Sequence, residues 1–225
     1  MTYKMYLLDI HDLEDKSLSE EAMALIDDKR REIANKYCKE KDRLRAIAAG
    51  LLLQVGFGEL EPTASVCVCE KTEKGICYKM QAKAMINWLL QGSNEVLPIP
   101  LKYNIGEHGK PSWDKDKLES INPRKKLWHF NLSHSGDYVV LVVADVEVGV
   151  DIQEDRVVKH FPGGYKAFSR MEAFVKCTGD GIAIGQEIYR KYNGEIPGYE
   201  MQQLYFIEQY ILNVCLANGN KYKIG

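Results

Sequence analysis

The sequence contains no long hydrophobic run, no low-complexity linker and no exact internal repeat. Its longest aliphatic stretch, Val139 to Ala144, is far shorter than the roughly 20 residues needed to cross a bilayer. The first twenty residues are acidic and polar rather than basic and then apolar, so they do not have the pattern of an export signal. We therefore expect neither a membrane span nor a membrane partner.

Paired cysteine ligands are also missing, because none of the six cysteines stands in C-x-x-C spacing, which leaves little support for a zinc site. The one cluster is Cys67, Cys69 and Cys77. Its simplest interpretation is strand positions that carry small apolar side chains. Free thiols fit a reducing compartment, and we expect a cytoplasmic protein.

The charge pattern gives no indication of a nucleic-acid partner, since the formal net charge of the 225 residues is −2. The charge is nevertheless uneven, because the segment 29–45 carries eight basic and three acidic residues. Such a stripe is either a solvated helix face or a surface for a phosphorylated ligand or an acidic protein. With 45% hydrophobic residues, the chain is long enough to bury a sizeable core.

Hydrophobic periodicity predicts an alternation of strands and helices along the whole chain. Before residue 105 the predicted elements are a strand Met5 to Ile10, helices from Ser17 to about Tyr37 and from Lys39 to Val55, a strand Val66 to Cys69, and a helix Tyr78 to Gln91. After it they are strands Leu127 to Leu132, Tyr138 to Ala144 and Val146 to Ile152, a helix Tyr165 to Cys177, and strands Gln203 to Glu208 and Tyr210 to Leu216. The strands 138–144 and 146–152 should pair as an antiparallel hairpin, and Asn218-Gly219 should form another hairpin turn.

This order of strand, helices and strands occurs twice. We therefore expect an α+β fold of two similar lobes related by a pseudo-twofold axis, residues 1–105 and 106–225. Each lobe would be a small antiparallel sheet packed with helices. The active site would lie in the cleft between the two lobes.

Two carboxylates, Asp151 at a strand end and Glu172 on the late helix, are the first candidates for a site. If they converge, they repel each other unless a cation lies between them, and oxygen ligands with vacant positions favour magnesium, which also takes substrate phosphates. Gln153 lies on the same strand face as Asp151 and would be a weaker or water-mediated ligand. The alternative for Glu172 and Lys176, four residues apart, is an ordinary pair on a helix surface.

Ser133, His134 and Ser135 follow one another at the end of an apolar strand, before the turn residue Gly136. Neighbours along a strand point to opposite faces, so they do not form a preset serine–histidine pair, and a hydrolytic triad is disfavoured. Hydroxyl, imidazole and turn amides together suit phosphate oxygens. A lone histidine at a strand end is otherwise more often structural.

The ordered set of these segments resembles the 4′-phosphopantetheinyl transferases of the broad-specificity, surfactin-synthetase-activating type. The resemblance rests on Phe-Asn-Leu-Ser-His-Ser-Gly at 130–136, Gly-Val-Asp-Ile-Gln at 149–153 and Phe-Ser-x-x-Glu-Ala-x-x-Lys-x-x-Gly-x-Gly from residue 168, with support from Gly109-Lys110-Pro111 and Asp42-Arg43-Leu44-Arg45. Each piece is weak alone, whereas the ordered set is specific.

The resemblance implies transfer of 4′-phosphopantetheine from coenzyme A to a serine of an apo acyl or peptidyl carrier protein, with magnesium as cofactor and release of 3′,5′-ADP. Such proteins serve fatty acid, polyketide or nonribosomal peptide biosynthesis. By similarity, magnesium would be held by Asp151, Gln153 and Glu172. Glu172 and Lys176 would be catalytic, Glu172 drawing the proton from the carrier serine and Lys176 stabilising the leaving phosphate. Coenzyme A would be bound by Arg30, Arg45, Lys110, Ser133, His134 and Lys176.

The chain departs from the family pattern in four places. Gln153, Phe168 and Met171 stand where glutamate, tryptophan and a basic residue are usual. Ser169 follows Asp151 after only 18 positions, where the family has an additional helical segment that receives the carrier; residues 160–164 should form a compact turn instead. Two alternatives stay open: a non-catalytic coenzyme A-binding protein and a magnesium-dependent hydrolase of the coenzyme A pyrophosphate.

Overall fold

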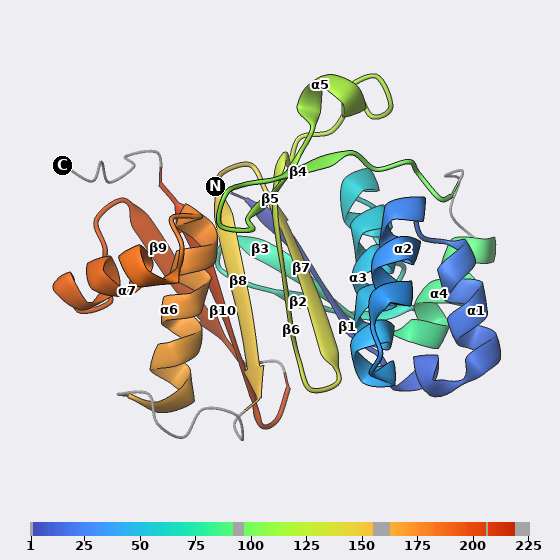
Figure 1. Cartoon of the computed structure of the whole chain (residues 1–225), viewed down its shortest axis with the longest axis horizontal. Coiled ribbons are helices and arrows are strands. Elements are labelled where there is room, and N and C mark those ends of the chain that lie inside the picture. The colour runs from blue at the N-terminus through green and yellow to red at the C-terminus, as the bar shows by residue number, and fades with distance from the viewer. Residues whose placement is uncertain (1, 92–96, 155–162, 206, 219–225) are drawn as a thin grey trace.

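The computed structural model describes residues 2–91, 97–154, 163–205 and 207–218. The chain forms four stacked layers: a group of helices, a five-stranded sheet, a three-stranded sheet and a second group of helices (Figure 1). This arrangement confirms the expected α+β class with several small sheets packed by helices. None of the helices among the described residues combines the length and the apolar character that crossing a bilayer requires.

The five-stranded sheet has the order β2-β3-β1-β7-β6. Its strands are β1 (Tyr3–Asp9), β2 (Cys67–Lys71), β3 (Gly75–Gln81), β6 (His129–Ser135) and β7 (Tyr138–Ala144). β1 pairs with β3 in parallel and with β7 antiparallel, so the expectation of purely antiparallel sheets is wrong here. The long helical connection after β1 brings the chain back to the same end of the sheet, which parallel pairing requires.

The helices that cover this sheet are α1 (Lys16–Ala24), α2 (Asp28–Lys36), α3 (Glu40–Gly58) and α4 (Ala82–Gln91), after a 3₁₀ turn at His11–Glu14. The helix expected up to Tyr37 is interrupted, because the side chain of Asp27 accepts a hydrogen bond from the backbone N–H of Arg30 and starts a new helix. The helix expected from Tyr78 begins only at Ala82. Tyr78 instead belongs to β3, where it stacks on Tyr6 of β1.

The three-stranded sheet has the order β8-β10-β9 and is covered on its outer face by two helices. Its elements are β8 (Val148–Glu154), α6 (Gly164–Thr178), α7 (Ile182–Lys191), β9 (Tyr199–Leu204) and β10 (Tyr210–Ala217). The prediction of a hairpin between residues 138–144 and 146–152 is wrong, because β7 pairs with β1 and β6 whereas β8 pairs with β10. The apolar residues of β7 and β8 pack face to face and form the core between the two sheets.

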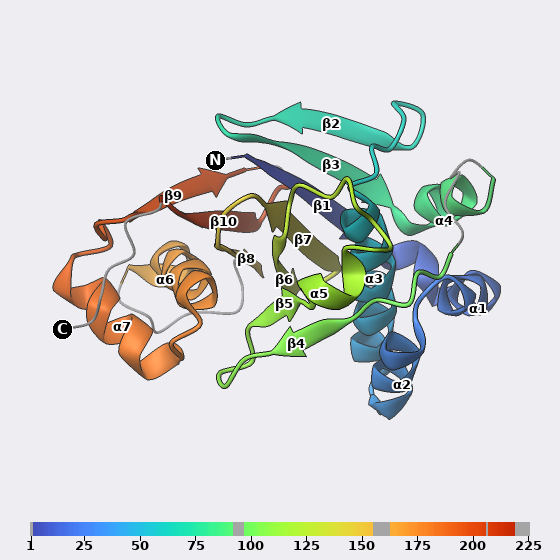
Figure 2. The same ribbon diagram turned by 90° about the horizontal axis from the view of Figure 1, so that it is seen from above.

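The strands β6 and β7, which we assigned to the second lobe, thus belong to the sheet that also contains β1 to β3. The proposed boundary between residues 105 and 106 does not separate the two sheets. The segment around it forms a small hairpin of β4 (Tyr103–Ile105) and β5 (Pro111–Trp113), followed by α5 (Lys115–Leu118). Figure 2 shows this hairpin beside β6, which it contacts. Of the predicted turns, residues 160–162 and Gly219 lie outside the described residues.

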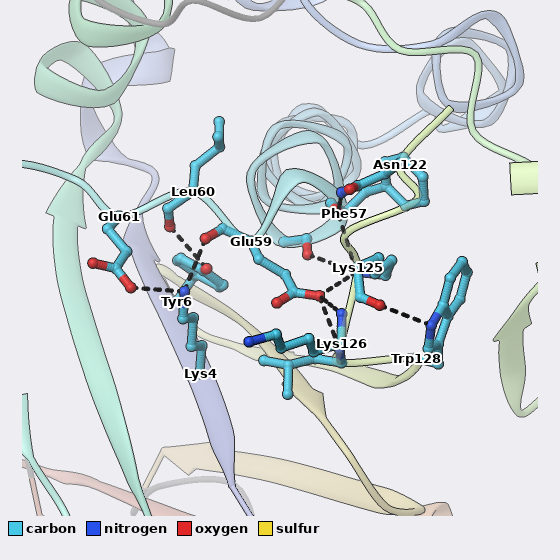
Figure 3. Close-up of polar contacts among 12 residues, drawn as sticks. Lys4, Tyr6, Phe57, Glu59, Leu60, Glu61, Asn122, Lys125, Lys126 and Trp128 are labelled. Carbon is cyan, nitrogen blue, oxygen red and sulfur yellow. Dashed lines mark hydrogen bonds and ion pairs between the residues drawn. The ribbon is translucent and has the colours of Figure 1, made fainter. Parts of the chain in front are cut away.

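A buried lysine anchors the C-terminal end of α3 (Figure 3). Nζ of Lys125 donates hydrogen bonds to the carbonyl oxygens of Phe57 at 3.0 Å and Gly56 at 3.3 Å, and lies 3.4 Å from a carboxylate oxygen of Glu59. The side chain of Lys125 is fully buried, and burial lowers its pKa to about 8. The helix end therefore has its free carbonyls satisfied by an ammonium group rather than by water.

Candidate functional site

The two sheets meet along β6 and β8, which are joined by side chains instead of a backbone ladder. Three polar residues at alternating positions of β6 accept hydrogen bonds from backbone N–H groups of β8, because alternate side chains of a strand point to the same face. The pairs are Asn131 with Val150 at 3.1 Å, Ser133 with Ile152 at 3.3 Å and Ser135 with Glu154 at 3.0 Å. The edge of β8 is thereby satisfied, and the polar end of β6 is held against Asp151.

Asp151 lies at the centre of this junction and is only 5% exposed. Its Oδ1 accepts hydrogen bonds from the hydroxyl of Ser133 at 3.0 Å and from Nζ of Lys176 at 2.6 Å. Lys176 also donates to the Ser133 oxygen at 3.0 Å. The other carboxylate oxygen, Oδ2, is buried and has no hydrogen-bond partner among the described residues, which is costly for a charged acceptor.

The helix α6 is held close to β8 by a glycine and a serine. A side chain at Gly149 would collide with backbone atoms of Ala173 and Cys177, so only glycine permits this approach. The buried hydroxyl of Ser169 donates to the carbonyl oxygen of Asp151 at 3.3 Å and accepts from the Asn213 amide at 3.0 Å. These contacts fix the helix so that the face with Glu172 and Lys176 lies toward Asp151.

Glu172 is half-buried on α6, and its pKa is raised above the ordinary value. Burial is the main cause, the positive charge of Lys176 acts in the opposite direction, and the negative charge of Asp151 adds to the rise. The charge of Asp151 therefore acts on Glu172. A raised pKa makes Glu172 a better proton acceptor near neutral pH than an ordinary glutamate.

A pocket of about 510 Å³ opens beside these groups. Among its lining residues are Lys110, Glu172 and Lys176, three of the predicted site residues. His108 and Asn131 also line it, although we had not assigned either to the site. The signal for Asn131 was present in the alternation of polar residues at 131, 133 and 135. We see no such signal for His108, which faces the pocket only because the β4–β5 hairpin folds over β6.

Lys110, at the rim of this pocket, is bonded to the end of α6 and to Glu147. Its Nζ donates a hydrogen bond to the carbonyl oxygen of Cys177 and lies 3.4 Å from a carboxylate oxygen of Glu147. An ammonium group at the last turn of a helix satisfies free carbonyls and complements the helix dipole. Lys110 thus secures the C-terminal end of α6, and its contact with coenzyme A stays a prediction.

Arg45 and His134 lie at the turn between β6 and β7. Nε of Arg45 donates to the carbonyl oxygen of Gly136 at 3.0 Å, and its guanidinium lies 2.6 Å from Asp42. The pKa of His134 is lowered by partial loss of hydration and by the positive charges of Arg45 and Lys176 near the ring. The imidazole is therefore neutral near pH 7 and close to two cationic side chains.

Neither Ser133 nor Arg30, which we predicted to bind the ligand, is among the lining residues of the pocket. The Ser133 hydroxyl is buried and makes three hydrogen bonds within the protein, which uses its one donor and both acceptor positions. Arg30 lies on α2 with its guanidinium carbon 5.3 Å from the ring centre of Tyr103. Neither position tests the predicted contact with coenzyme A.

The donor set around Asp151 fits a hard divalent cation with open coordination positions. The unpartnered Oδ2 and the nearby Glu172 supply two carboxylates, and Gln153, also buried on β8, adds a neutral oxygen on the same strand face. Among the described residues, no group of three or more histidine, cysteine, aspartate or glutamate side chains is gathered at a metal site. Magnesium sites generally use only one or two protein carboxylates together with water and substrate phosphates.

The chain is similar to a phosphopantetheinyl transferase over part of its length. A Bacillus pumilus protein, 4′-phosphopantetheinyl transferase psf-1, is 36% identical over 118 aligned residues. The alignment covers 41% of this chain and 47% of that protein, so the chain spans about half the length of the curated relative it matches. No protein-family model matches the chain. The similarity agrees with the family resemblance of the motifs at residues 130–136, 149–153 and 168–181.

Proposed function

We propose that this protein transfers 4′-phosphopantetheine from coenzyme A to a serine hydroxyl of an acyl or peptidyl carrier protein, with release of 3′,5′-ADP. The observation that carries the proposal is the pocket of about 510 Å³ lined by Lys110, Glu172 and Lys176 beside buried Asp151. The similarity to a phosphopantetheinyl transferase supports the same reaction class. A diphosphate needs its charge neutralised at the bridging and leaving oxygens, and this pocket concentrates groups that can do so.

The acidic groups of the pocket have separate roles in this proposal. Asp151 and Glu172, with Gln153 as a weaker ligand, would hold magnesium, which when bound neutralises charge on the pyrophosphate. Glu172 would also accept the proton of the carrier serine, directly or through water, and its raised pKa supports this role. Since a nearby cation favours the charged form of a carboxylate, much of the activation must come from positioning the two reactants.

In the proposed complex, the cationic side chains and the imidazole of His134 would bind phosphate groups of coenzyme A. Lys176 would stabilise the leaving phosphate, which requires it to face the pocket that its side chain lines. Arg45 and His134 would receive phosphate oxygens at the β6–β7 turn. Lys110 and Arg30 would bind the adenosine phosphate end.

The test is to incubate the protein with coenzyme A, magnesium and an apo carrier protein, and then to weigh the carrier by mass spectrometry. We expect a mass increase of one phosphopantetheine group. Cleavage of coenzyme A without a change in the carrier would show a hydrolase instead. Binding of coenzyme A with neither reaction would show a non-catalytic binder.

A matched pair of variants ties the activity to the site. Asp151→Asn removes the charge but keeps the shape, and should lower the rate by about 100-fold or more. Asp116→Asn removes an exposed carboxylate from α5 and should leave the rate unchanged. Equal rates for the two variants would contradict the assignment.

A further inference from the structure

The ammonium group of Lys176 lies beside the carboxylate that we assign to the metal ion. Nζ lies 2.6 Å from Oδ1 of Asp151, which is the distance of a strong charge-assisted hydrogen bond. A divalent cation bound to either oxygen of this carboxylate would stand close to the ammonium, and two cations at such a separation repel each other strongly where little water screens them. Asp151 has 7% of its side chain exposed, so the screening is weak.

From this geometry we infer that Lys176 and a divalent cation compete for the carboxylate of Asp151, so that Lys176 must turn into the pocket before the ion can bind. The inference rests on the proposed function only in taking Asp151 as a ligand of the cation. Lys176 would then have two roles: it would block access of the metal ion to Asp151 until it moves, and it would bind the phosphate.

The two members of the pair differ in their freedom to move. Asp151 belongs to β8, whose backbone on either side is bonded to Asn131 and Ser133 and whose own carbonyl accepts from Ser169. Lys176 has 27% of its side chain exposed and lines the pocket of about 510 Å³. The lysine is therefore the member that moves, by rotation of a long flexible stem.

The pocket offers Lys176 two alternative partners once it leaves Asp151. Glu172 lies one helical turn earlier on α6, at the i, i+4 spacing that allows an ion pair, and the positive charge of Lys176 already opposes the rise in the pKa of Glu172. Phosphate oxygens of a bound ligand would be a stronger partner. A phosphorylated ligand that attracts Lys176 would thus free Asp151 for the metal, and the two would bind cooperatively.

The neutral side chain of Gln153 makes this competition effective. With glutamine at that position, Asp151 is the one carboxylate that β8 places on this face, since Glu154 points the other way. The ammonium group of Lys176 alone then neutralises the one negative charge that β8 contributes to the site. A cation has little excess negative charge to attract it until Lys176 has moved.

The test measures binding of Mn²⁺ alone to the ligand-free protein by electron paramagnetic resonance, with no coenzyme A and no carrier present. Lys176→Met should bind Mn²⁺ about fivefold or more tightly than the parent protein, which is the size of a modest coupling between sites. Lys110→Met, which removes another ammonium from the same pocket without touching Asp151, should change the affinity less than about twofold. Unchanged or weaker binding by Lys176→Met, or an equal gain in both variants, would overturn the inference.

A measurement on the unmodified protein covers the case in which Lys176→Met fails to fold. Acetylation of lysine side chains, read by mass spectrometry, should increase at Lys176 when Mg²⁺ is added and stay constant at Lys110. Constant or reduced labelling of Lys176 at saturating Mg²⁺ would contradict the inference that the ion displaces Lys176 from Asp151. If the carrier fails to gain mass while Lys176→Met still binds Mn²⁺ more tightly than the parent protein, that combination would reject the proposed transferase activity and leave this inference standing.

Discussion

The hydroxyl of Ser133 donates a hydrogen bond to Oδ1 of Asp151 at 3.0 Å while it accepts one from the backbone N–H of Ile152 at 3.3 Å. One small side chain of β6 thus orients the carboxylate and closes the edge of β8. The hydroxyl oxygen of Ser133 also accepts a hydrogen bond from Nζ of Lys176 on α6. Ser133 therefore links both sheets and this helix. Loss of this side chain would therefore affect both the orientation of Asp151 and the contact between the two sheets.

Ser133→Ala should destabilise the protein by about 1–3 kcal/mol, because it leaves the buried N–H group of Ile152 without an acceptor and removes one of the two hydrogen bonds to Oδ1 of Asp151. The free energy of unfolding, measured with urea, checks this value. Ser112→Ala is the control, since Ser112 is exposed on β5, and it should change the stability by less than about 0.5 kcal/mol. Equal losses in the two variants would mean that the junction contributes no stability.

Gly149→Ala should displace α6 from β8, because the added methyl group would collide with backbone atoms of Ala173 and Cys177. Backbone cannot move aside as a flexible side chain can, so we expect a loss of about 2 kcal/mol or more. Gly106→Ala is the matched control, since its nearest neighbour would be at ordinary contact distance, 3.4 Å. Thermal unfolding of both variants measures the difference, and a stable Gly149→Ala would show that α6 has room to shift.

Gln153→Glu should tighten Mn²⁺ binding, because it adds a negative charge on the strand face that carries Asp151. A titration followed by electron paramagnetic resonance measures the affinity. Gln203→Glu adds the same charge on β9, where Asn213 of β10 stands between it and Asp151 in the strand pairing, and should have a smaller effect. If Gln153→Glu leaves the affinity unchanged, residue 153 does not lie near the ion.

The rate should depend on the ionisation of Glu172. Its pKa is raised by burial in the metal-free protein, whereas bound magnesium favours its charged form, and kcat/KM should fall along an acid limb as the pH drops through the pKa that results. Glu172→Gln should lower the rate by about 100-fold and remove the limb. A Glu172→Gln variant that keeps the acid limb and the parent rate would contradict the role of Glu172 as proton acceptor.

Stability should rise with pH because of Lys125, whose pKa is lowered to about 8 in the folded protein from an ordinary value of 10.5. Between these values the unfolded chain binds the proton that the folded protein has released, so a higher pH favours folding by about 1 kcal/mol per pH unit. Below pH 8 both states are charged and the effect is constant. Urea unfolding between pH 7 and about 9.5 should show this rise in the parent protein and not in Lys125→Met; identical slopes would reject it.

Much of the candidate site could be recognised in the sequence because it lies on strongly patterned elements. The apolar stripe of α6 predicted the helix that carries Glu172 and Lys176, and the structure has it at Gly164–Thr178. Asp151 at the end of an apolar strand was equally clear. The alternation on β6 placed Ser133 and His134 on opposite sides, as their different exposure shows.

The pairing of strands could not be predicted in the same way. β7 and β8 are adjacent and apolar, which suggested a hairpin, yet each pairs with a distant strand. An apolar strand indicates that its faces are buried but does not indicate which edge partner it has. The buried Lys125 was missed for a related reason, because the carbonyl oxygens of Gly56 and Phe57 that hold it come from far away in the chain.

The sequence by itself determined the α+β class, the helix with Glu172 and Lys176, and the strand with Asp151, because these depend on local periodicity and on residue type. Only the tertiary structure decided that Ser133 bonds Asp151, that Lys176 pairs with the same carboxylate and that Lys110 closes the end of α6. Such contacts join segments whose separation in sequence carries no information about their distance in space. They arise because buried polar groups must find partners, and the partners available are decided by how the layers stack.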